Sequence, residues 1–204
     1  MHKLTYIFLL LFFFSAVSFA QTTPKGNKPP PPPPPPPVSN NKHPVFGTYY
    51  KLESYDVLIP FKGPANISPK NEISDRIYNS YQYAFPRPTD DINLLYGIDI
   101  CEFKSNTKLK TPESKINSFS GIIKTMYGQS VKGTLIKEEI TGTGDNYKIR
   151  QRIKAISPAV GVIYITSLYM VHKMLAIRLF VFTTSEAENK KINDYFASIK
   201  YGNN

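Results

Sequence analysis

Four stretches in the last third of the chain decide the fold: TLIKEEI at 134–140, YKIRQRIKAI at 147–156, VIYITSLYMV at 162–171 and LAIRLFVF at 175–182. Their alternating or β-branched and aromatic residues favour β-strands. Short runs of turn residues separate the stretches, and links of this length join antiparallel neighbours. We therefore predict an antiparallel four-strand β-meander at the C-terminal end.

Two helices are expected beside these strands. The first begins at Pro112 after a capping Thr111 and ends at Gly128. The second follows the last strand, where Thr183 and Glu186 have the spacing of a capping box. Apolar residues at helical spacing give the expected buried faces: Ile116, Phe119, Ile123 and Met126 in the first helix, and Ile192, Tyr195, Phe196 and Ile199 in the second.

Further strands are predicted in the first half of the folded region: Phe46–Leu52, Tyr55–Ile59, Ile77–Phe85 and Leu94–Phe103. Pro60 is expected to end the second of these, and the prolines and glycine within 60–75 predict a loop. The sequence thus indicates an α+β fold, an antiparallel β-sheet flanked by helices, in a single domain over 44–204.

Residues 1–20 have the pattern of a secretory signal peptide. His2 and Lys3 precede an apolar run, and Ser18 and Ala20 supply the small residues of a cleavage site. We expect export to the periplasm or the cell exterior; an uncleaved membrane anchor is the alternative. Gln21 stands where a lipoprotein carries its lipid-bearing cysteine, so the chain is not expected to be a lipoprotein. No later apolar run reaches membrane length.

Residues 21–43 form a proline-rich segment, predicted to be a disordered tether. Nine consecutive prolines at 29–37 favour a polyproline II rod, which spans about 28 Å at roughly 3.1 Å per residue. A spacer is the favoured role, and a ligand for a proline-recognising domain is the alternative.

The chain is basic, with 25 Lys and Arg against 15 Asp and Glu, a net charge of +10. This balance suits an anionic partner, such as an envelope polymer or lipid headgroups. Export and the lack of a nucleic-acid-binding motif argue against nucleic acid.

One predicted strand carries a row of cations. Side chains alternate between the two faces of a strand, so Lys148, Arg150, Arg152 and Lys154 share one face, with apolar residues on the other. Glu139 on the preceding strand is expected to meet Lys148 or Arg150. The row is a candidate binding site for an anionic ligand; the alternative is a solvated outer face.

No catalytic or metal-binding constellation is found, so no enzyme activity, metal or cofactor is expected. Cys101 is the only cysteine and lies in an apolar run, which indicates a buried thiol. His43 and His172 have no partner at metal-ligand spacing. The tyrosines of the first half suit half-buried strands, or alternatively ligand contacts.

The order of elements resembles the PsbP/DcrB-like superfamily. The likeness covers roughly 49–201 and is strongest at Leu175–Phe182 and the helix ending in Tyr195-Phe196-Ala197-Ser198-Ile199. This resemblance implies an antiparallel sheet flanked by helices in exported or peripheral proteins with accessory or binding roles, and it carries no shared catalytic residues. The expected function is therefore an exported, non-enzymatic binding or accessory protein that contacts an anionic surface or partner. The alternative is a small-molecule or lipid carrier with a pocket between the sheet and the helix at 116–126.

Overall fold

The computed structural model describes residues 38–43, 47–51, 55, 57–61, 66–67, 71–73, 75–84, 93–130, 132–158 and 160–201. The predicted signal peptide and residues 21–37 of the predicted tether lie outside this set. No helix within the described residues is long and apolar enough to span a bilayer.

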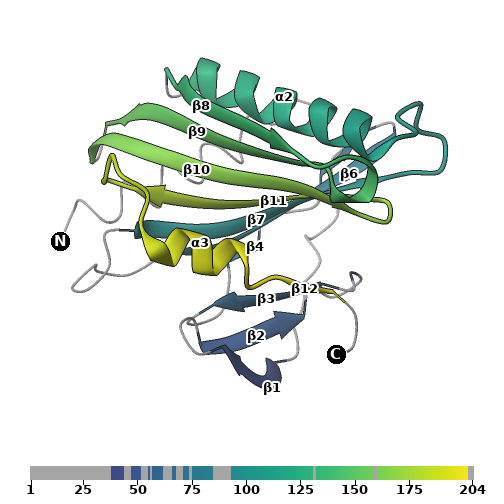
Figure 1. Ribbon diagram of the computed structural model, residues 1–204, viewed down its shortest axis with the longest axis horizontal. Coiled ribbons are helices and arrows are strands. Elements are labelled where there is room, and N and C mark those ends of the chain that lie inside the picture. Colours follow the sequence, from purple (N-terminus) through teal and green to yellow (C-terminus); the bar gives the residue numbers. More distant parts are fainter. Residues whose placement is uncertain are drawn as a thin grey trace, which may run out of the picture.

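A large antiparallel sheet forms the centre of the molecule (Figure 1). Its strands run in the order β4-β6-β7-β11-β10-β9-β8, and β5 pairs separately with β6. The strands are β4 (Asn66–Ile67), β5 (Asn71–Ile73), β6 (Arg76–Ala84), β7 (Asn93–Phe103), β8 (Thr134–Thr141), β9 (Lys148–Ser157), β10 (Gly161–His172) and β11 (Leu175–Thr183). The prediction of a single domain built mainly from antiparallel sheet, with helices, is confirmed.

The predicted loop at 60–75 needs correction, because β4 and β5 lie within it. Both short strands pair with β6, whose nine residues offer a long edge. Both strands are short, at two and three residues.

A smaller sheet of four strands lies beside the large one. Its order is β1-β2-β3-β12, with β1 (Val38–His43), β2 (Gly47–Lys51), β3 (Val57–Phe61) and β12 (Lys200–Tyr201). The last six residues of the predicted tether therefore form a strand. Pro60 was predicted to end β3 but lies inside it. At this position β3 pairs with β2, whereas the pairing of β3 with β12 covers only Val57 and Leu58.

Helix α2 (Pro112–Ser130) starts where the sequence predicts but ends later. The hydroxyl of Thr111 accepts a hydrogen bond from the Ser114 backbone N–H, at 3.2 Å. The helix continues through Gly128 and ends at Ser130. Lys132, just after the helix, has a left-handed φ of 48°. Gly133 N–H then donates to the Tyr127 carbonyl, at 3.1 Å, and closes the helix end.

Helix α3 (Lys190–Phe196) does not use the predicted capping box. Thr183 is the last residue of β11, and Asn189 caps the helix by accepting from the Ile192 N–H at 3.2 Å. The later start follows from the length of β11, which keeps Thr183 in the sheet. The predicted burial of Ile192, Tyr195 and Phe196 is confirmed, whereas Ile199, predicted on the same helix face, lies beyond the end of α3 and is only partly buried.

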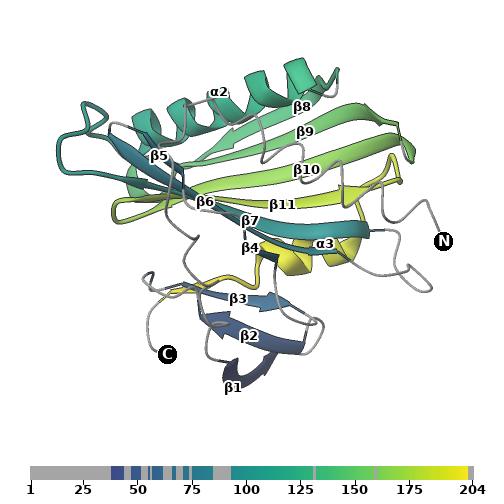
Figure 2. The same ribbon diagram turned by 180° about the vertical axis from the view of Figure 1, so that it is seen from behind.

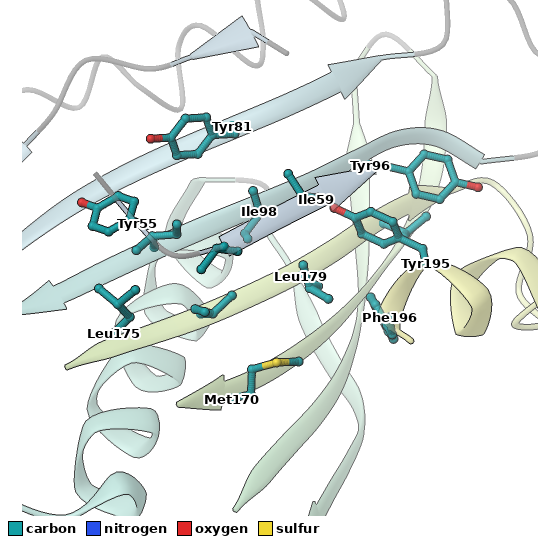
Figure 3. Packing of buried hydrophobic residues seen from close by; sticks show 14 of the residues in the cluster. Tyr55, Ile59, Tyr81, Tyr96, Ile98, Met170, Leu175, Leu179, Tyr195 and Phe196 are labelled. Carbon is teal, nitrogen blue, oxygen red and sulfur yellow. The ribbon is translucent and has the colours of Figure 1, made fainter. Parts of the chain in front are cut away.

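Both faces of the large sheet are covered (Figures 1 and 2). On one face, α2 buries Ile116, Phe119 and Ile123 against β9, β10 and β11. On the other face, α3 and β3 pack on the sheet, and Figure 3 shows Tyr195, Phe196 and Ile59 directed towards Ile98 and Leu179. The result is a central sheet between two separate hydrophobic clusters.

The cluster under α2 contains a buried ion pair that the sequence analysis missed. Arg178 and Asp99 are 1% and 2% exposed, and Arg178 Nη1 donates to Asp99 Oδ2 at 2.6 Å. The same guanidinium donates to Ser167 Oγ and Tyr127 Oη, both at 2.9 Å. Burial raises the pKa of Tyr127, so this phenol stays neutral. All three guanidinium nitrogens are thus satisfied inside the core.

Candidate functional site

The predicted basic row lies on the face of β9 that is turned towards α3. Residues 149, 151 and 153 of β9 are buried on the α2 side, as the predicted alternation requires. On the opposite side Lys148 and Lys154 are exposed, while Arg150 is partly and Arg152 almost wholly covered. The four cations share one face but differ in what they can offer a ligand.

Arg152 serves the fold. Its side chain is 6% exposed, and Nη1 donates to Thr166 Oγ1 at 2.7 Å. Nη2 donates to the carbonyls of Ser185 and Glu186, at 2.9 and 2.6 Å. These bonds fasten the segment between β11 and α3 to the sheet. In this structure the charge of Arg152 is directed to acceptors within the chain, and its role in ligand binding stays a prediction.

Arg150 is also neutralised, by a partner that the sequence analysis did not foresee. Its guanidinium pairs with Glu188, donates to Asn193 Oδ1 at 2.8 Å, and lies 5.3 Å from the centre of the Phe196 ring. Glu139 lies opposite Arg150 in the β8–β9 register, as expected. However, Glu139 pairs with its neighbour Lys137 at 2.7 Å.

A groove of about 590 Å³ opens beside Lys148, between the ends of β9 and β10 and the segment from α3 to β12. Its volume falls within the range of small-molecule sites, about 300–1,000 Å³. Apolar and aromatic side chains make up one part of its lining: Leu168, Met170, Val171, Phe196, Ile199 and Tyr201. Polar groups provide slightly more of the exposed lining surface than apolar groups do, so the groove is a mixed surface beside Lys148, the exposed end of the basic row.

The polar lining of the groove is mostly basic. Lys148, His172 and Lys173 face one acidic residue, Asp145. The His172 ring stacks on Tyr201, with centroids 4.3 Å apart and planes at 20°. Tyr201 Oη also donates to Met170 Sδ at 2.6 Å. Burial raises the pKa of Tyr201, so its phenol is neutral and adds no negative charge.

His172 and Lys173 lie between the strands predicted at 162–171 and 175–182, where the sequence indicates only a short turn. They become part of a concave site because β12 brings Tyr201 against His172, although 29 positions separate the two in sequence. The turn assignment contained no signal for this contact. An aromatic residue close to the C-terminal end was the only hint.

The other sequence candidates lie elsewhere. Tyr49, Tyr55 and Tyr81 are core residues, which agrees with the structural interpretation of the tyrosines. Cys101 is buried, and this burial raises the pKa of its thiol to about 12. Within the described ranges, no group of three or more His, Cys, Asp and Glu residues is placed to hold a metal ion.

Comparison with other proteins adds no assignment. No protein-family model matches this chain, and a search of curated proteins finds no match. The groove and the basic face of β9 are therefore candidate sites on the basis of their geometry in this structure alone.

Proposed function

We propose that this protein is exported and binds, without catalysing a reaction, an anionic ligand that carries an apolar part. The groove bounded by Lys148, His172 and Tyr201 is the observation that carries the proposal. The predicted signal peptide supports export to the periplasm or the cell exterior. A PsbP/DcrB-like relationship stays a proposal that rests on the sequence resemblance at Leu175–Phe182 and the helix that follows it.

One part of the groove can receive an apolar segment. Phe196 and Met170 lie at its base, each 6% exposed, and the Tyr201 and His172 rings form a stacked wall. A ligand chain lying here removes apolar area from water, which contributes roughly 25 cal/mol per Å².

The basic lining favours an anionic head. Lys148 and Lys173 are exposed and carry two positive charges against the single carboxylate of Asp145. A carboxylate or phosphate placed between the lysines keeps part of its hydration while gaining their attraction.

A fluorescent aliphatic carboxylate tests the proposal. We expect saturable binding that weakens with salt, exceeds that of the matching alcohol, and falls about tenfold in K148E. K108E is the matched control, since Lys108 is exposed in the loop between β7 and α2, outside the groove. Absence of saturable binding, or equal binding by K148E and K108E, would refute the groove as the site.

A second candidate function is contact with an anionic surface through the basic face of β9, as the sequence predicts. Lys148 and Lys154 are exposed on this face, and Lys154 lies 6.0 Å from the centre of the Tyr164 ring. Co-sedimentation with anionic vesicles should fall in K148E/K154E and in high salt. Arg150 and Arg152 are unsuitable targets, because charge reversal there would also release the segment that Arg152 holds. Unchanged sedimentation of K148E/K154E would remove this candidate.

A further inference from the structure

Strand β8 leaves one edge of the large sheet open. In the order of strands it is the last on its side, and β9 is its only strand neighbour among the described residues. All eight of its residues are exposed. An edge of this kind presents a row of backbone N–H and C=O groups that another strand can pair with.

The edge also exposes apolar side chains. Leu135, Ile136 and Ile140 are 36%, 46% and 55% exposed, although they belong to the largest sheet of the protein. Exposed apolar residues grouped on one element mark an interaction surface more often than scattered ones do. The composition of β8 therefore suits a protein strand as its neighbour.

We propose that a second copy of this chain pairs with β8, strand against strand and antiparallel, about a twofold axis at Glu138. In such a pair, residues equally distant from the axis lie opposite each other. Lys137 then faces Glu139 of the second copy. This contact occurs twice, so the strand is complementary to itself in charge over 137–139; the pairing with β9 shifts register between Leu135 and Lys137, so regular pairing with a second copy is proposed only from Lys137 onwards.

Neighbouring registers are unfavourable. An axis at Lys137 sets two lysines opposite each other, and an axis at Glu139 sets two glutamates opposite each other. The axis at Glu138 also brings two glutamates together, but each is engaged within its own chain. Glu138 Oε2 accepts from Lys124 Nζ at 3.0 Å and from Gln151 Nε2 at 2.6 Å. These bonds lower the pKa of Glu138, with the one from Gln151 first, and direct its charge towards α2.

The exposed ion pair between Lys137 and Glu139 on β8 can exchange its partners between the two copies. Lys137 and Glu139 are 60% and 48% exposed and bond to each other at 2.7 Å. In the dimer, Lys137 of each copy bonds to Glu139 of the other copy. Both side chains stay at the solvent-exposed rim of the interface, so this exchange of partners adds little desolvation cost. One strand from each copy makes a small interface, so we expect a weak dimer that dissociates on dilution.

Charge reversal tests the register. The purified protein, expressed from the full-length chain, should dimerise with concentration in sedimentation velocity. K137E sets Glu opposite Glu139, and E139K sets Lys opposite Lys137, so each variant should associate about tenfold more weakly. An equimolar mixture of the two variants should associate again, because opposite charges then face each other. K108E should behave as the parent protein.

A cysteine at the axis checks the geometry separately. E138C places two thiols opposite each other, and mild oxidation should link them, whereas the native Cys101 is buried. I156C, exposed on β9, should stay unlinked. A parent protein that remains monomeric at all concentrations, or a variant mixture as weak as its components, overturns the proposal. This test does not involve the groove, so its failure leaves the proposed function standing.

Discussion

Replacing Asp99 by Asn is predicted to be among the most damaging conservative changes in this protein. The substitution keeps the size of the side chain but removes the charge that compensates Arg178 inside the core. Both residues are almost fully buried, at 2% and 1% exposed, so water cannot take over that role. The remaining acceptors of Arg178, Tyr127 Oη and Ser167 Oγ, are neutral.

The expected loss follows from this geometry. Breaking a buried ion pair on one side costs about 3–5 kcal/mol, because an uncompensated charge is left in the interior. This is a large fraction of the roughly 5–15 kcal/mol that stabilises a domain. Replacing both partners, as in D99L/R178M, removes the buried charge and should cost less than D99N alone.

Urea unfolding measures these differences, provided that the slope with denaturant is unchanged. The matched control is D194N, which removes a carboxylate from an exposed pair of similar length, Lys190 to Asp194 at 2.7 Å with the lysine 85% exposed. That change should cost under about 1 kcal/mol. The reasoning is refuted if D99N lowers the free energy of unfolding no more than D194N does, or if D99L/R178M is less stable than D99N. Either result would mean that Asp99 does not compensate a buried charge on Arg178.

Three further predictions concern packing, reactivity and pH. A Cβ at Gly97 would lie 2.2 Å from a phenylalanine ring carbon, so G97A should lose about 1–3 kcal/mol in urea unfolding, whereas G121A in α2, which meets nothing within 4 Å, should not be destabilised. Cys101, with a pKa raised to about 12, should resist a disulfide-forming dye in mildly alkaline buffer until urea unfolds the protein; rapid labelling of the native state would contradict its burial. The hydrogen bond from Arg76 lowers the pKa of Asp75, so its stabilisation is present above the ordinary value of 3.8 and is lost as pH falls through the lowered pKa. D75N should thus be less stable than the parent at neutral pH and differ little from it in strong acid; a difference that persists in acid would argue against this linkage.

Local patterns predicted most of the strands. On β9, Ile149 and Ile153 are buried and Lys148 and Lys154 exposed, as a period of two requires. The start of α2 followed from its cap and first-turn proline. The errors were of two kinds. Short strands were missed in the predicted loop and tether, at β1, β4 and β5. Element ends were misplaced where tertiary contacts compete with local preference: Thr183 is paired in β11, and Asn189 caps α3 in its place.

The predicted basic row shows the limit of a one-strand argument. Alternation placed four cations on one face, but exposure depends on what covers that face. The segment at 185–188 and α3 lie over Arg150 and Arg152 and supply carbonyl and carboxylate acceptors. None of these acceptors is within 30 positions of the arginines, so no local pattern could reveal them.

By itself the sequence determined the proline-rich segment and the antiparallel strand pattern, because each depends on neighbours a few residues apart; the export signal stays a prediction from the sequence. Tertiary structure alone decided which cations remain accessible, that Asp99 and Arg178 pair inside the core, and that His172 and Tyr201 form one wall of a groove. These features depend on side chains brought together by strand order and by the return of β12. Burial and charge compensation are properties of that arrangement, since a residue's electrostatic surroundings are set by its neighbours in space.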